Sequence, residues 1–216
     1  LLIAWQRSQR MILLFSFVTL LLTAIAAFNG LGGNALAVTT LIYVDDYGRF
    51  ALLTILVVAM FSLWLSAKRL QADVEVHDEY YLLVLLTLLG ASILVVSDHF
   101  ASLFLGFELL SISLVGLVGY FRQQQYAVES GFKYLILSAS ASSFMLLGIA
   151  FIYAQSGSLA FSPNTELTGA INTGLSGLSE DNGYVLSLGF ILFFSGMAFK
   201  LSLVPFHYWT PDVYQG

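Results

Sequence analysis

Six long apolar stretches constrain this chain more than any other feature of its sequence. They run over about Met11–Phe28, Phe50–Ala67, Tyr80–Val96, Phe100–Tyr120, Ala127–Tyr153 and Tyr184–Val204. About 17–25 apolar residues are what a helix needs to cross a bilayer, where each backbone polar group must be bonded within the protein. Only 10% of the residues are charged, whereas a soluble domain carries about 25%. The sequence therefore predicts an all-α, polytopic transmembrane helix bundle with about six spans.

The composition also excludes several classes of site. The chain has no cysteine, which excludes disulfides, thiolate metal sites and iron–sulfur ligation on this chain. The glycines Gly30, Gly32 and Gly33 follow a predicted helix and not a strand, so they do not form a phosphate-binding loop. No nucleophile–base pair and no basic surface for nucleic acid stands out. We expect no cofactor and no metal on this chain, and any redox chemistry on other subunits.

The two ends of the sequence suggest a piece of a longer protein. The chain begins at Leu1 in an apolar stretch without an initiator methionine, and it ends at Gly216 in a segment that contains proline and glycine. We expect residues 1–216 to form a single membrane domain, the N-terminal part of a longer subunit. A segment rich in Ser, Gly, Asn and Thr, residues 156–183, is expected to be a long outer loop.

The positive charges indicate an orientation. If the spans alternate, one side of the membrane carries Arg7, Arg10, Lys68, Arg69 and Arg122, and the other side carries Arg49. The positive-inside rule makes the first side cytoplasmic. The remaining cations, Lys133 and Lys200, lie inside predicted spans.

Lys200 and Glu108 are the ionisable residues that most strongly suggest function. A lysine at the centre of a membrane helix costs about 2.5–3.5 kcal/mol on insertion scales, so such residues usually serve a function. Glu108 is the acidic residue that lies well inside a span, where a carboxylate must be neutralised or paired. Lys200 and Lys133 are its candidate partners. We expect an ion pair that releases a proton when it separates; a static salt bridge between helices is the alternative, as is a Lys200 that snorkels to the interface.

Pro205 and His207 follow Lys200 in the last stretch. Proline has no N–H to donate to the carbonyl four residues earlier, so we expect the helix to break or kink at Pro205. An ionisable group beside a broken helix is typical of ion-transport sites. A histidine side chain can exchange protons near neutral pH, so His207 could relay protons, or it could be an interfacial residue beside Tyr208 and Trp209.

Several further residues have more than one interpretation. Lys133 lies six residues into its helix, where it could carry protons or snorkel to the interface. The small residues Ser138–Ser143 favour close helix packing, with a hydrated polar seam as the alternative. Gly189 and Gly196 share a helix face with Lys200 and predict either close approach of a neighbouring helix or a water-lined seam. Asp98 and His99 are interpreted as a helix cap rather than as metal ligands.

Three segments of the sequence resemble a known family. They are DEYYLLVLLTLLGASILVVSDHFASLFLGFELLSI, KYLILSASASSFMLLGIAFIYAQSG and FKLSLVPFHYWTPDVYQG. They are similar to the antiporter-like membrane subunits of respiratory complex I, the proton-translocating NADH:quinone oxidoreductase, and in particular to the bacterial subunit N family. The segment after Pro205, WTPDVYQG, has the subunit N form, whereas subunits L and M and the Na⁺/H⁺ antiporter subunits tend to have leucine–proline–aspartate–alanine there.

The resemblance implies a fold and a function. It implies an antiporter-like helix bundle with inverted repeats, of which this chain would include helices two to seven, the last one broken. It implies that Glu108 and Lys200 form the charged pair of a proton path and that Lys133 also belongs to it. The chain would be a non-redox translocase subunit of the bacterial inner membrane. NADH, flavin, iron–sulfur clusters and quinone would bind other subunits, and the partners would be the other membrane-arm subunits, lipid and protons.

Two other functions remain open. A cation/proton antiporter subunit of the multisubunit Na⁺/H⁺ type would use the same Glu and Lys plan. A scaffold bundle, in which buried charges only hold helices together, would need no proton path.

Overall fold

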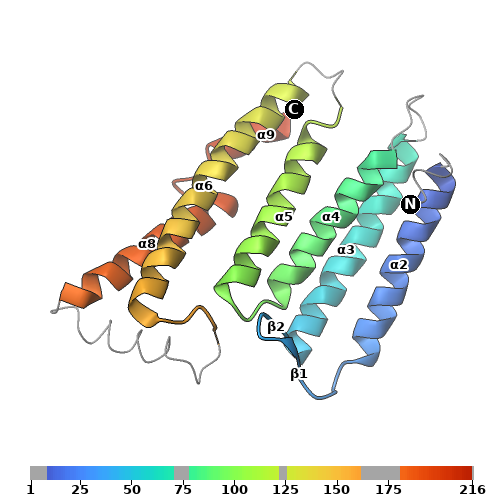
Figure 1. Cartoon of the computed structure of the whole chain (residues 1–216). Helices are drawn as coiled ribbons and strands as arrows, with labels where there is room; N and C mark the ends of the chain where they lie inside the picture. Colours follow the sequence, from blue (N-terminus) through green and yellow to red (C-terminus); the bar gives the residue numbers. More distant parts are fainter. Residues whose placement is uncertain (1–8, 71–77, 122–125, 162–180, 216) are drawn as a thin grey trace.

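The structure of the chain is a computed structural model, and it describes residues 9–70, 78–121, 126–161 and 181–215 (Figure 1). Within these ranges the helices are α2 (Gln9–Asn29), α3 (Asp46–Leu70), α4 (Asp78–Val95), α5 (Phe100–Val118), α6 (Ala127–Ser156), α8 (Asp181–Lys200) and α9 (Trp209–Gln215). Each of the six predicted spans coincides with one of the helices from α2 to α8. The prediction of a helical membrane bundle is confirmed.

Four of these helices are long and apolar enough to cross a membrane. The spanning segments are Met11–Asn29, Asp46–Ala67, Phe100–Val118 and Ala127–Ser156. α4 and α8 contribute shorter apolar helices, Glu79–Val95 and Tyr184–Lys200. Most of residues 156–183, the predicted outer loop, lies outside the described residues; α6 continues to Ser156, and α8 already begins at Asp181.

Successive helices run in opposite directions and lie side by side from α2 to α6, with α8 packed against α6 (Figure 1). Two clusters of buried apolar side chains hold them together. One joins α2, α3 and α4 around Leu20, Leu56 and Leu63. The other joins α5, α6 and α8 around Phe100, Met145 and Phe193. The second cluster lies on the helices that carry Glu108 and Lys200, so it supports their relative position.

α6 and α8 approach each other closely through glycines. A Cβ atom added to Gly148 of α6 would lie 2.5 Å from the backbone nitrogen of Phe193 and 2.6 Å from the carbonyl oxygen of Gly189, both in α8. Such contacts are possible only where a residue has no side chain. The close approach that Gly189 and Gly196 predict is therefore present, and α6 is the neighbouring helix.

A short β-hairpin at one end of the bundle was not expected from the sequence. β1 (Leu36–Thr39) pairs antiparallel with β2 (Ile42–Val44). The amide of Tyr43 donates to the carbonyl of Val96, and the hydroxyl of Ser102 donates to the carbonyl of Leu41 at 2.8 Å. The strands are rich in β-branched residues, which favour extended structure, but they are shorter than the apolar stretches on which the prediction of an all-α bundle was based.

Arg49 lies at this end of the bundle, and its side chain is buried. It lies in the first turn of α3 and donates to the carboxylate of Asp46 at 3.0 Å and to the carbonyl oxygen of Asn34 at 3.0 Å. It also donates to the carbonyl oxygen of Gly33 at 3.4 Å. Arg49 therefore joins α3 to the loop between α2 and β1.

Replacing Arg49 with methionine should loosen this loop. The carbonyls of Gly33 and Asn34 would lose their donors, and hydrogen bonds to a charged group contribute about 1.5–3 kcal/mol each. We expect proteolysis within residues 30–34 of the membrane-embedded protein to accelerate at least about tenfold. Arg49→Lys, which keeps the charge but not the fork of donors, should give an intermediate rate. Equal rates for all three proteins would show that Arg49 does not restrain the loop.

Candidate functional site

The side chains of Glu108 and Lys200 lie in contact inside the bundle. The Lys200 Nζ is 3.2 Å from the Glu108 Oε1, although the residues are 92 positions apart in the sequence. The Lys200 side chain is 6% exposed and that of Glu108 is 28% exposed. The ring of Phe107 lies 5.7 Å from the same ammonium group. The structure thus brings together the acid of α5 and the cation of α8.

Two serine hydroxyls complete this pair. Lys200 donates to the Oγ of Ser111 at 2.7 Å. Ser142 of α6 donates to the Oε1 of Glu108. An ammonium group has three donors and no acceptor, whereas a hydroxyl can accept and donate at the same time. The pair is therefore embedded in a small polar cluster contributed by α5, α6 and α8.

The sequence analysis missed Ser111 and grouped Ser142 with the small packing residues. A signal for Ser111 exists, because a residue three positions after Glu108 lies on the same face of a helix. Ser142 carries no comparable signal. It belongs to a run of small residues, and only the rotation of α6 decides which of them turns inward. Ser138 and Ser142 are buried, whereas Ser140 and Ser143 are exposed.

α8 ends at Lys200, which is earlier than the predicted break at Pro205. Residues 201–208 are turns, and α9 follows. A helix that included Pro205 would need a bond from its nitrogen to the carbonyl of Leu201, which proline cannot form. The chain turns before that point: the amide of Leu203 bonds to the carbonyl of Ala198, and Ser202 has a positive φ of 54°. Lys200 is consequently the last helical residue.

Lys133 is not part of the Glu108 cluster. Its Nζ lies 2.9 Å from the Oε1 of Glu129, one turn earlier in α6, and 3.2 Å from the Oδ2 of Asp212 in α9. The Lys133 side chain is 45% exposed. The expectation that Lys133 could pair with Glu108 is wrong for this structure, because Lys133 is turned towards α9.

His207 also lies apart from the pair. It occupies the turn segment between α8 and α9, and its ring stacks on that of Tyr208 with the ring centroids 4.7 Å apart. Its Nδ1 atom is buried without a hydrogen-bond partner among the described residues. Neither open interpretation of His207 is decided by these contacts.

His99 is the N-cap of α5, as expected from the sequence, whereas Asp98 makes backbone hydrogen bonds with Leu41 and Phe161. The Nδ1 of His99 accepts a hydrogen bond from the amide of Ala101 at 3.1 Å, at the N-terminus of α5. Among the residues that the structure describes, no group of three or more His, Asp or Glu side chains could hold a metal ion.

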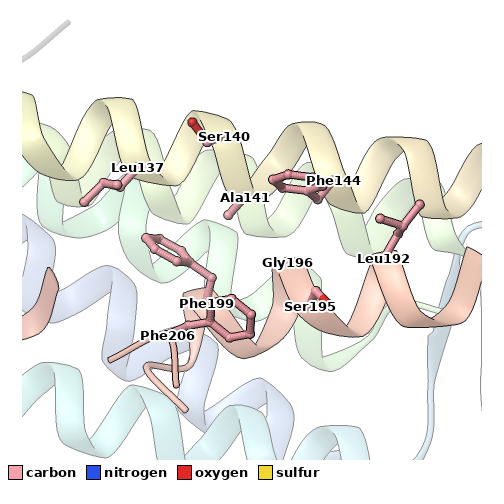
Figure 2. Close-up of a pocket in the computed structure, with 9 residues that line it drawn as sticks. All are labelled: Leu137, Ser140, Ala141, Phe144, Leu192, Ser195, Gly196, Phe199 and Phe206. Atoms are coloured by element: carbon pink, nitrogen blue, oxygen red, sulfur yellow. The ribbon is translucent and has the colours of Figure 1, made fainter. Parts of the chain in front are cut away.

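A pocket of about 340 Å³ lies between α6 and α8 (Figure 2). Its lining consists of Leu137, Ser140, Ala141, Phe144, Leu192, Ser195, Gly196, Phe199 and Phe206. Figure 2 shows Leu137 and Ala141 of α6 on the side towards α8, with Phe206 reaching in from the turn segment. None of these lining residues has an ionisable side chain.

The geometry suits the holding of a proton. Lysine carries a proton on a flexible side chain, and its proton affinity changes readily with burial and neighbouring charge. Here the carboxylate of Glu108 stabilises the charged ammonium of Lys200. The Ser111 hydroxyl accepts a hydrogen bond from Lys200, and the Ser142 hydroxyl donates one to Glu108. Movement of Glu108 away from Lys200 would remove this stabilisation.

Comparisons with known proteins agree with this fold. The family described as NADH:quinone oxidoreductase/Mrp antiporter, transmembrane, matches residues 97–216. A chain of respiratory complex I from Thermus thermophilus with bound aureothin is similar, with a TM-score of 0.77 and 28% identity over 96% of this chain and 42% of that chain. A chain of the membrane-bound sulfane sulfur reductase, an archaeal respiratory membrane complex, has a TM-score of 0.75 and 26% identity, covering 96% and 43%. This chain thus spans less than half the length of either.

Proposed function

The chain belongs to the NADH:quinone oxidoreductase/Mrp antiporter family of membrane proteins, and from this membership we propose that it is a proton-translocating subunit of the membrane arm of a complex I. The observation that carries the proposal is the partly buried contact between Lys200 and Glu108. Charged side chains inside a membrane protein are energetically costly, and those that are present usually serve a function. Proton movement is the function that a lysine beside a carboxylate and two hydroxyls supports best.

The proposed mechanism is a charge switch. With Glu108 in contact, the Lys200 ammonium keeps its proton. When electron transfer in other subunits draws the two side chains apart, the carboxylate no longer stabilises the ammonium, and Lys200 releases its proton along the helix seam. Lys133 and His207 are further candidates for the path, on the cytoplasmic side by the charge distribution of the sequence.

The finer assignment is to subunit N of a bacterial inner-membrane complex. The segment WTPDVYQG after Pro205 supports it. In this assignment NADH, flavin, iron–sulfur clusters and quinone are bound by other subunits, and other membrane-arm subunits are the direct partners. The similar chains come from multisubunit respiratory complexes, which supports assembly with other membrane subunits.

Replacement of Glu108 by glutamine in the complete complex tests the proposal. Glutamine keeps the size and a hydrogen-bonding oxygen but has no charge to switch. We expect a proton-to-electron ratio below that of the unaltered complex, measured in vesicles as proton uptake per NADH oxidised and corrected for the amount of assembled complex, which should fall because Lys200 loses its counter-charge. Glu79→Gln, an exposed carboxylate in the first turn of α4, serves as the matched control and should pump normally. An unaltered ratio in Glu108→Gln would refute the charge switch.

A cation/proton antiporter is the second candidate function, because the matching family includes the Mrp antiporters. The same vesicles discriminate between the two. Sodium uptake driven by a proton gradient without NADH would favour the antiporter, whereas proton uptake that requires NADH favours the complex I subunit.

A further inference from the structure

The short helix α9, which follows the break, is docked on the beginning of α6. The Lys133 Nζ lies 3.2 Å from the Asp212 Oδ2, and the Ser130 Oγ donates to the backbone carbonyl of Asp212 at 3.0 Å. Val213, in the same turn of α9, is buried. Asp212 therefore binds α6 with its side chain and its backbone at once.

Trp209, the first residue of α9, reaches back to the end of α8. Its indole Nε1–H donates to the carbonyl oxygen of Phe199 at 3.1 Å. The indole ring packs between two aromatic rings, that of Phe199 with centroids 5.5 Å apart and that of Tyr134 with centroids 5.2 Å apart. Trp209 thus contacts both the end of α8 and the docked face of α6.

The carbonyl that Trp209 binds belongs to the residue immediately before Lys200. In an unbroken helix this oxygen would accept from the amide of Leu203, which here bonds to Ala198 instead. The amide of Ser202 provides one bond to it, at 3.0 Å, and the indole provides the second. Trp209 therefore restrains the last turn of α8, from which the Lys200 side chain extends to Glu108.

We propose that Trp209 is a positioning residue for Lys200 and that the Asp212–Lys133 pair holds Trp209 in place. The inference rests on the proposed proton path. The Lys200 stem is flexible, so its ammonium group reaches Glu108 and Ser111 reproducibly only if its backbone is restrained. Misplacement of a reacting group by about 1 Å can cost on the order of a hundredfold in rate. In this account Lys133 acts on Lys200 through α9, without direct contact.

Replacing Trp209 with phenylalanine in the complete complex tests this role, because the aromatic packing is kept and the indole N–H is lost. We expect normal assembly, an unchanged KM for quinone and a proton-pumping rate about two- to tenfold lower, the range for loss of one hydrogen bond. The solvent deuterium isotope effect on turnover should rise, because the proton step is slowed; a purely structural role would not change it. Trp64→Phe, on α3 beside Phe61, is the matched control and should behave like the unaltered complex. Normal pumping with an unchanged isotope effect in Trp209→Phe would overturn the inference.

Asp212→Asn tests whether the Asp212–Lys133 pair holds Trp209 in place. If Asp212 acts by holding Trp209, this variant should resemble Trp209→Phe, and the double variant should be no slower than the slower single variant. If Lys133→Gln stops pumping while Asp212→Asn pumps normally, Lys133 acts as a proton carrier, and the Asp212–Lys133 pair does not act by holding Trp209. A further variant, Lys200→Arg, distinguishes failure of the proposed proton path from failure of the positioning role. Normal pumping in Lys200→Arg refutes the proton path itself. Lost pumping in Lys200→Arg together with normal pumping in Trp209→Phe refutes only the positioning role.

Discussion

Lys200→Arg in the complete complex should assemble normally and should not translocate protons through this subunit. Arginine keeps the positive charge beside Glu108, so the ion pair and its contribution to helix association remain. Its guanidinium group does not release a proton under protein conditions, and a carrier that cannot release its proton stops the cycle. Because proton-transfer groups typically contribute about 10²–10⁴-fold to a rate, we expect the proton flux through this subunit to fall by at least about a hundredfold.

The measurement is proton uptake into vesicles during NADH oxidation, with the amount of assembled complex determined on native gels. Lys200→Met is the matched variant that removes the charge. It leaves the partly buried Glu108 without its cation, which is destabilising, so it should lower the amount of complex as well as pumping. The scaffold interpretation also predicts normal assembly for Lys200→Arg, but with normal pumping. That result would remove Lys200 from the proton path.

Gly148→Ala should prevent α6 and α8 from packing as they do. The added methyl group would lie 2.5 Å from the Phe193 nitrogen and 2.6 Å from the Gly189 carbonyl oxygen. Both are backbone atoms, which cannot move without displacing α8. Overpacking costs about 1–3 kcal/mol and occasionally more; with two backbone contacts of this kind we expect about 3 kcal/mol. Displacement of α8 also moves Lys200 away from Glu108.

Thermal unfolding of the purified complex and the yield of assembled complex measure this effect. Gly116→Ala is the matched control on α5. Its added methyl group would meet the Cδ2 of Leu83 at 2.9 Å, and the end of a leucine side chain can rotate away. We expect a small change for Gly116→Ala and a large loss of stability for Gly148→Ala. Equal stability of the two variants would show that the glycine contact does not determine how α6 and α8 pack.

The sequence was sufficient to predict the class of fold. Long apolar stretches and scarce charges are properties of consecutive residues, and the bilayer accepts few structures other than helices for them. Each predicted span therefore has a matching helix. The hairpin of Leu36–Thr39 and Ile42–Val44 was missed, because strands this short are stabilised mainly by tertiary contacts such as those with Val96 and Ser102.

The candidate site was predictable only in part. Glu108 and Lys200 stand out because unpaired charges are unfavourable in an apolar span. The same reasoning proposed Lys133 as a second partner of Glu108, and in the structure Lys133 pairs with Glu129 and Asp212 instead. A roughly 100° step per residue separates an inward from an outward side chain, and no local pattern specifies this rotation for a helix with small residues on several faces.

The sequence by itself determined that this chain is a helical membrane protein with an ionisable pair in its interior and a break after the last span. These follow from hydrophobic length, from the energy of charge in an apolar medium and from proline's missing N–H, all of which act locally. Only the tertiary structure decided which lysine meets Glu108, that Ser111 and Ser142 join them, and that Trp209 binds the last turn of α8. Those contacts depend on the rotation and spacing of α5, α6 and α8, which glycine contacts between distant segments determine.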